Sequence, residues 1–211
     1  MVPAATSRMA AAILCAWTAA ASVAAAAGHH HFQSLLELRR NNVVIQHWDL
    51  SCGAAALATL LDYQQGERLP EMTIVQAMLH RTDPLKVQHR GGFSWLDLKR
   101  FVESRGYSAA GYEDMSLDDV AASAPLIVPI RVFSRLPDSH HFVVLRGIKG
   151  SRVVLADPAW GNRTISVSEF ERVWFNHSGF VVERRDGRRP PNRLTVQASD
   201  AFLLPSDRLG P

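Results

Sequence analysis

Apolar and polar residues alternate along the chain with two different spacings, helical in its first half and strand-like in its second half. In the first half, apolar residues recur every three or four positions, which is the period of an amphipathic helix. The helices predicted in this way cover Phe32 to Arg40, Gly53 to Asp62, Glu71 to His80, Ser94 to Ser104 and Ser116 to Ser123. The polar stretch from 81 to 92 breaks this pattern. We expect a loop there that shapes a cleft.

The second half contains continuous runs of β-branched and apolar residues, which are typical of buried strands. The predicted strands cover Leu126 to Phe133, His141 to Ile148, Arg152 to Ala156 and Phe180 to Glu183, with a short helix at Ser168 to Phe175. The turn residues Lys149, Gly150 and Ser151 separate two of these strands and predict a hairpin. Together the two halves predict an α+β domain whose N-terminal half is helical.

The first 27 residues resemble a secretory signal peptide. They contain one positive charge at Arg8, an apolar run from about Met9 and small residues up to Ala27. An uncleaved membrane anchor is the alternative, because the run approaches the roughly 20 residues that span a bilayer. Most of the run is alanine, which partitions weakly into lipid, so we expect cleavage near Ala27 and no membrane span in the mature chain. The expected location is the periplasm, or the periplasmic face of the membrane if the leader is retained.

Cleavage would leave 184 residues, enough for one domain at 28–183 and a tail at 184–211. The tail contains Pro190-Pro191 and little apolar periodicity, so we expect it to be extended or disordered. Its six arginines and three aspartates give it a net charge of +3, which equals the formal charge of the whole chain. The basic charge therefore belongs to the tail, and we expect no nucleic-acid partner. A docking arm for an acidic partner or a membrane surface is the alternative.

Cys52 is the single cysteine that remains once Cys15 is removed with the leader. A lone thiol in an oxidising compartment is inert and buried, paired with another chain, or used in chemistry. Cys52 stands at the start of the predicted helix 53–62, after the cap-type residues Asp49, Leu50 and Ser51. The positive end of a helix dipole favours a thiolate, which is the nucleophilic form of cysteine.

A nucleophilic cysteine needs a base and a group that orients the base. His29 to His31 begin the expected mature chain, where a solvated terminus is favoured over a weak metal site. His140 and His141 begin one strand of the predicted hairpin, and Asp157 ends the other strand, just before Pro158. The hairpin would bring this aspartate close to the histidines. Only one of two adjacent strand residues can face the cysteine, and the residues alone leave open which one does.

Three motifs in their order and spacing resemble peptidase family C39, the papain-like cysteine proteases best known as leader-cleaving domains of bacteriocin exporters. They are Gln46 six residues before Cys52, the run from His141 to Val144, and the segment from Asp157 to Gly161. The resemblance extends from about Val43 to Phe180. It implies a papain-like fold in which the nucleophile helix packs on an antiparallel sheet. Ser51 departs from the family pattern, because members often carry an acidic residue at that position.

The resemblance also implies roles for four residues. Cys52 would attack the scissile carbonyl, His141 would act as base, Asp157 would orient the histidine, and Gln46 would donate to the oxyanion. No cofactor or metal is expected for this chemistry.

The expected function is that of a cell-envelope cysteine peptidase that cleaves an exported polypeptide, near glycine or other small residues. The implied context is a secretion or surface-fibre (functional amyloid) system, with a fibre subunit or an export component as the polypeptide partner. Two alternatives remain open. One is a peptide-binding module that does not cleave, and the other is a papain-like cell-wall amidase.

Overall fold

The computed structural model describes residues 34–131 and 140–203. The predicted signal peptide, His29 to His31 and the last eight residues lie outside the described residues. The described helices are α2 (Leu35–Arg40), α3 (Cys52–Tyr63), α4 (Glu71–Leu79), α5 (Pro84–Arg90), α6 (Trp95–Glu103), α7 (Leu117–Ser123) and α8 (Val167–Val173), with 3-10 turns η2 (Phe175–His177) and η3 (Ala198–Phe202). The described strands are β1 (Tyr107–Tyr112), β2 (Leu126–Arg131), β3 (His140–Lys149), β4 (Arg152–Asp157), β5 (Gly161–Ser166) and β6 (Gly179–Arg184).

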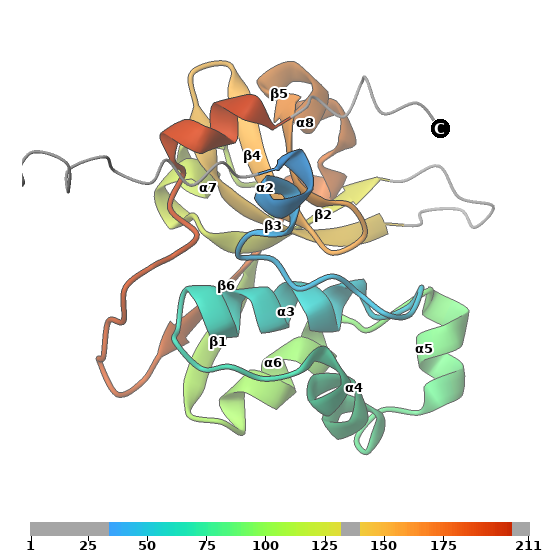
Figure 1. Cartoon of the computed structure of the whole chain (residues 1–211). Helices are drawn as coiled ribbons and strands as arrows, with labels where there is room; N and C mark the ends of the chain where they lie inside the picture. Colours follow the sequence, from blue (N-terminus) through green and yellow to red (C-terminus); the bar gives the residue numbers. More distant parts are fainter. Residues whose placement is uncertain (1–33, 132–139, 204–211) are drawn as a thin grey trace, which may run out of the picture. The chain divides into compact units, whose positions relative to one another are not determined.

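The six strands form one antiparallel sheet in the order β1-β6-β2-β3-β4-β5. Helices α3 to α6 precede the sheet in the chain and lie below strands β2 to β5 in Figure 1, beside β1 and β6. The predicted hairpin is present as β3 and β4, with Val144 opposite Ala156. The α+β class and the helical N-terminal half are therefore confirmed.

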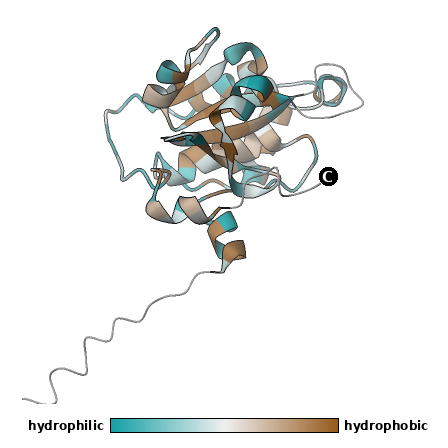
Figure 2. Cartoon of the chain, turned by 90° about the horizontal axis from the view of Figure 1, so that it is seen from above, coloured by the Kyte–Doolittle hydropathy of each residue, from teal (hydrophilic) through white to brown (hydrophobic). Residues whose placement is uncertain are grey.

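Two apolar clusters cover the two faces of the sheet. Successive residues of β3 alternate between them: Phe142 and Val144 pack in the cluster that contains α3, whereas Val143 and Leu145 pack in the cluster that contains α8. Figure 2 shows apolar residues concentrated in the strands and in the helix faces turned toward them. Burial on both faces explains why these strands are continuous apolar runs in the sequence.

The structure adds a helix where the polar stretch 81–92 predicted a loop. Asp83 caps α5, with its side chain accepting from the Leu85 N–H, and Pro84 occupies the first helical position. Gly91 ends the helix in a left-handed conformation. These start and stop signals produce a helix without apolar periodicity. The edge strands β1 and β5 were also missed, because their sequences contain few β-branched residues.

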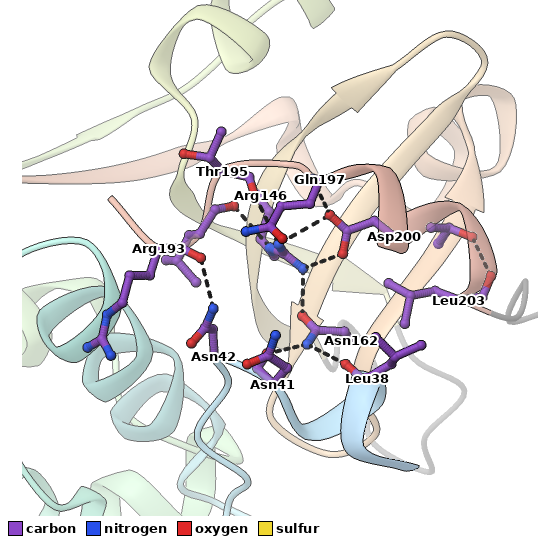
Figure 3. Close-up of polar contacts among 12 residues, drawn as sticks. Leu38, Asn41, Asn42, Arg146, Asn162, Arg193, Thr195, Gln197, Asp200 and Leu203 are labelled. Carbon is purple, nitrogen blue, oxygen red and sulfur yellow. Dashed lines mark hydrogen bonds and ion pairs between the residues drawn. The ribbon is translucent and has the colours of Figure 1, made fainter. Parts of the chain in front are cut away.

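The segment after β6, predicted to be an extended or disordered tail, packs on the domain as far as Leu203. Figure 3 shows its contacts with Arg146 of β3, whose guanidinium donates to both carboxylate oxygens of Asp200 at 2.9 and 3.2 Å. The same side chain donates to the carbonyls of Leu194 and Thr195 at 3.0 and 3.2 Å. Leu194 is fully buried. These partners lie about 50 residues from Arg146 in sequence, so local composition could not reveal them. We name residues 185–203 the C-terminal strap.

None of the described helices is long and apolar enough to cross a membrane.

Candidate active site

Cys52 is the first residue of α3, and this helix is the central element of the helical layer. Ten consecutive residues from Cys52 to Leu61 are buried, because α3 itself carries alanines and leucines on every side. A Cβ atom added at Gly53 would lie 3.1 Å from the Phe142 side chain, tighter than ordinary contact. The glycine after the cysteine therefore lets the start of α3 approach β3. Cys52 is a free thiol and is 6% exposed.

His141 and Asp157 lie on neighbouring strands and are hydrogen-bonded to each other. The His141 Nε2 atom is 2.7 Å from Asp157 Oδ1, and the carboxylate is fully buried. Asp157 also accepts from the Ala159 N–H at 2.9 Å and from Arg163 Nε at 2.8 Å. These contacts fix the carboxylate, and they leave Nδ1 as the histidine nitrogen available to another group.

Cys52 lies close enough to the same imidazole to affect the pKa of His141, so Cys52, His141 and Asp157 form one interacting group. Burial lowers the pKa of His141, but the hydrogen bonds and charges of Asp157 and Cys52 outweigh it and raise the pKa from 6.5 to about 9. Burial raises the pKa of Asp157, and the His141 and Arg163 charges together with the Ala159 N–H hold it below its ordinary value. The pair is therefore an imidazolium and a carboxylate at neutral pH.

The two adjacent histidines have different surroundings, which resolves the choice that the residues left open. The His140 ring stacks on Phe175 with centroids 5.2 Å apart and meets the edge of Phe142 at 5.2 Å. The contact with Asp157 belongs to His141. His140 therefore lines the space in front of Cys52, and His141 is the histidine joined to both the aspartate and the thiol.

Gln46 begins the turn that leads into α3. Its backbone N–H donates to the Pro158 carbonyl at 2.9 Å, which ties the turn to the residue after Asp157. Its side-chain Nε2 donates to the Trp48 carbonyl at 2.9 Å, and one N–H of this amide remains for another acceptor. The structure therefore brings all four predicted residues into one region, through contacts from Cys52 to His141, to Asp157 and on to the Gln46 backbone.

A cleft of about 630 Å³ opens beside Cys52. Four aromatic side chains line it, those of Phe93, Trp95, Phe142 and Phe175. The segment 81–92 contributes to the cleft at its end, because residues 89–92, which include the last two residues of α5, line the cleft. An apolar cleft beside a thiol–imidazole pair can hold the side chains of an extended polypeptide.

Two charged residues at the site were missed from the sequence. Arg163 of β5 pairs with Asp157 at 2.8 Å, and Glu71 of α4 contacts the turn before Cys52. An arginine on a strand and a glutamate at a helix start are common, so neither carried a local signal. Within residues 34–131 and 140–203, no group of three or more metal-ligating side chains is gathered.

Comparison with family models matches residues 40–185 to the Peptidase C39 family. Among curated proteins, the chain is 40% identical over 173 residues to the "Probable functional amyloid protease FapD" of Pseudomonas aeruginosa, covering 78% of this chain and 73% of that protein. It is 35% identical over 142 residues to the protein of the same name from Pseudomonas fluorescens, covering 67% of this chain and 61% of that one.

Solved structures are similar to the same region. A double glycine motif protease from an AMS/PCAT transporter, solved in complex with a leader peptide, has a TM-score of 0.54 at 26% identity and covers 67% of this chain and 90% of that one. The peptidase domain of Streptococcus ComA has a TM-score of 0.56 at 20% identity and shares the fold, covering 68% and 98%. The matched family model covers more than half of the chain together with Cys52, His141 and Asp157. The chain therefore belongs to the Peptidase C39 family and is a cysteine peptidase with a papain-like α+β fold.

Proposed function

We propose that Cys52, His141, Asp157 and Gln46 form the catalytic site that hydrolyses peptide bonds in this chain. The observation that carries the proposal is the 2.7 Å hydrogen bond between His141 and the fully buried carboxylate of Asp157, on an imidazole that also interacts with Cys52 at the cleft. A buried carboxylate that holds one nitrogen of an imidazole fixes the ring orientation and stabilises the imidazolium. The other nitrogen then faces the nucleophile.

The first half of the reaction follows from these positions. The His141 imidazolium already holds the proton of the reacting thiol, and the Cys52 sulfur attacks the carbonyl carbon of the scissile bond as a thiolate. The charge that develops on the carbonyl oxygen is held by the Gln46 amide and by the Cys52 backbone N–H. When the tetrahedral intermediate collapses, the C–N bond breaks and the imidazolium donates its proton to the leaving amine.

The second half releases the acyl group. A water molecule attacks the thioester carbonyl and gives one proton to His141, and the Cys52 sulfur leaves with the electrons of the broken C–S bond. The products are the free carboxylate of the N-terminal fragment and the regenerated thiolate–imidazolium pair.

The proposed substrate is an exported polypeptide in an extended conformation, either a fibre subunit or a component of its export machinery. This step rests on the relatives: two are named probable functional amyloid proteases, and one structural neighbour is a double glycine motif protease in complex with a leader peptide. Cleavage near glycine or another small residue is part of the proposal. The aromatic cleft would then take a larger apolar side chain a few residues from the cut.

The proposed location is the periplasm, reached through residues 1–27 as a cleaved leader. The apolar run and small-residue end of this segment support the proposal. Intact mass measurement of the protein from a periplasmic fraction tests it directly. The expected mass is that of a chain that begins at or near Gly28. A full-length protein in the membrane fraction would contradict the proposal.

The catalytic proposal is tested with fluorescently labelled casein, an unfolded polypeptide, and with purified peptidoglycan as a second substrate. The wild-type protein should cleave casein, and Cys52→Ala and His141→Ala should each lose the activity. His80→Ala, which removes a histidine at the end of α4, is the matched control and should retain it. Equal cleavage by Cys52→Ala and wild type would refute the proposal. Binding of casein without cleavage, or cleavage of peptidoglycan alone, would favour the module or the amidase instead.

A further inference from the structure

Glu71 carries a buried carboxylate, and its partners come from the turn that precedes Cys52. The residue is 5% exposed at the first position of α4. Its two oxygens accept the backbone N–H of His47 at 3.1 and 3.2 Å, and Oε2 lies 2.6 Å from His47 Nδ1. Oε1 accepts the hydroxyl of Ser51. Burial of a charged carboxylate costs free energy unless the group is hydrogen-bonded. The hydrogen bonds that offset this cost for Glu71 all come from residues of the turn.

Ser51 occupies the N-cap position of α3 but does not cap the helix with its side chain. A serine at this position usually accepts an N–H from the first turn of the helix. Here the hydroxyl instead contacts Glu71, the Trp48 carbonyl and the Trp48 N–H. The Ser51 side chain therefore leaves the N–H groups of the first turn of α3 without a side-chain cap.

The same turn holds the side chain of Gln46. The Trp48 carbonyl accepts from Gln46 Nε2 at 2.9 Å and from the Ser51 N–H at 3.2 Å. Gln46 Oε1 is buried and has no hydrogen-bond partner among the described residues. The orientation of the amide therefore depends on the Trp48 carbonyl. That carbonyl is held by Ser51, and Ser51 is held by Glu71.

We propose that Glu71 is a positioning residue for the oxyanion-binding turn, residues 46–52. It holds the Ser51 hydroxyl away from the start of α3 and fixes the Trp48 carbonyl that orients the Gln46 amide. This inference rests on the oxyanion role proposed for Gln46 and deepens it. Loss of an oxyanion donor reduces kcat by roughly 10²- to 10³-fold. Loss of Glu71, which only positions such a donor, should therefore reduce kcat by a smaller factor.

Glu71→Ala should lower kcat for peptide cleavage by about 10- to 100-fold and change KM by less than about threefold. In the Gln46→Ala background, Glu71→Ala should cause little further loss, because the group it positions is already absent. Alkylation of Cys52 by iodoacetamide does not pass through an oxyanion, so its rate should stay within about twofold of wild type. A general disturbance of the fold would slow both reactions together.

Two further variants keep the test decisive. Ser51→Ala removes the hydroxyl that connects Glu71 to Trp48. It should show the same lower kcat with an unchanged alkylation rate, and it replaces Glu71→Ala in the test if that variant does not fold. Glu71→Gln retains an acceptor for the Ser51 hydroxyl and should recover part of kcat. Glu67→Gln is the matched control, since this glutamate also has several polar partners, Arg105 and Tyr107, but none in the turn. Its kcat should remain that of wild type.

A folded Glu71→Ala variant with wild-type kcat would overturn the inference. A loss of kcat that adds fully to that of Gln46→Ala, or a parallel loss of alkylation, would also overturn it. The Cys52→Ala variant is measured in the same assay and decides the proposed function separately. Cleavage that survives Cys52→Ala counts against the catalytic proposal, whereas cleavage that needs Cys52 and ignores Glu71 counts against this inference alone.

Discussion

Replacement of Asp157 by asparagine should move the alkaline limit of activity. In the wild-type protein the pKa of His141 is about 9, and the hydrogen bond of Asp157 is the largest contribution that raises it, followed by that of Cys52 and then by the charge of Asp157. Asparagine has nearly the same shape but no charge. Without the charge, burial is opposed mainly by Cys52, and the pKa of His141 should fall well below its wild-type value.

The size of the effect follows from the two pKa values. A change from 6.5 to about 9 corresponds to roughly 3 kcal/mol in favour of the charged histidine in the folded protein. Because the folded-state pKa of His141 is the higher one, this stabilisation is complete below about pH 6.5 and is lost as the pH rises through 9. Asp157→Asn should remove most of it, and should lower kcat by about 10²- to 10⁴-fold at pH 7.5.

The assay is kcat/KM for peptide cleavage between pH 5 and 10, with urea unfolding at pH 6 and pH 9.5. Wild-type activity should fall to half near pH 9, and the half-point for Asp157→Asn should lie well below this pH. Arg163→Gln is the control, because it retains the carboxylate and removes the cation that competes for it. Its half-point should stay near 9 or rise. A limit near pH 9 in Asp157→Asn, or near 6.5 in the wild type, would refute the role assigned to the carboxylate.

Three further perturbations have defined outcomes. Gln46→Ala should lower kcat by about 10²- to 10³-fold with KM nearly unchanged. Initial rates measured over a range of substrate concentrations check this, and a change in KM alone would contradict it. Asp200→Asn should reduce the free energy of unfolding by about 3–5 kcal/mol, because Arg146 is left buried without its counter-ion; a urea midpoint equal to wild type would contradict this. Gly161→Ala should destabilise the fold, since its φ is +81° and the new Cβ would lie 2.3 Å from the Arg39 carbonyl; an unchanged melting temperature would be inconsistent with the clash.

The elements with strong local signals were predictable from the sequence. The helix that begins at Cys52 and the hairpin that brings Asp157 to His141 depend on runs of neighbouring residues and on one turn. The proposed site residues could be named because they stand at the ends of those elements. The preference for His141 over His140 in the proposal comes from the structure, since adjacent positions on a strand are equivalent in any local pattern.

The missed features all depend on contacts between distant parts of the chain. Glu71 meets Ser51 across 20 residues, and its position at a helix start resembles that of any acidic first-turn residue. The strap contains isolated apolar residues such as Leu194, which have no period to detect. Burial of Arg146 is favourable only once its distant partners are in place, so neither end of the contact predicts the other.

The C-terminal strap also sets the order in which the molecule can be completed. A ribosome that has added residue 185 has made the whole region matched by the family model, yet the central strand β3 still contains an arginine with no counter-ion. Asp200 is made 54 residues after Arg146. Arg146 therefore gains its counter-ion only after residue 200 has been made. The strap thus completes the electrostatic environment of β3 after every strand of the sheet is already present.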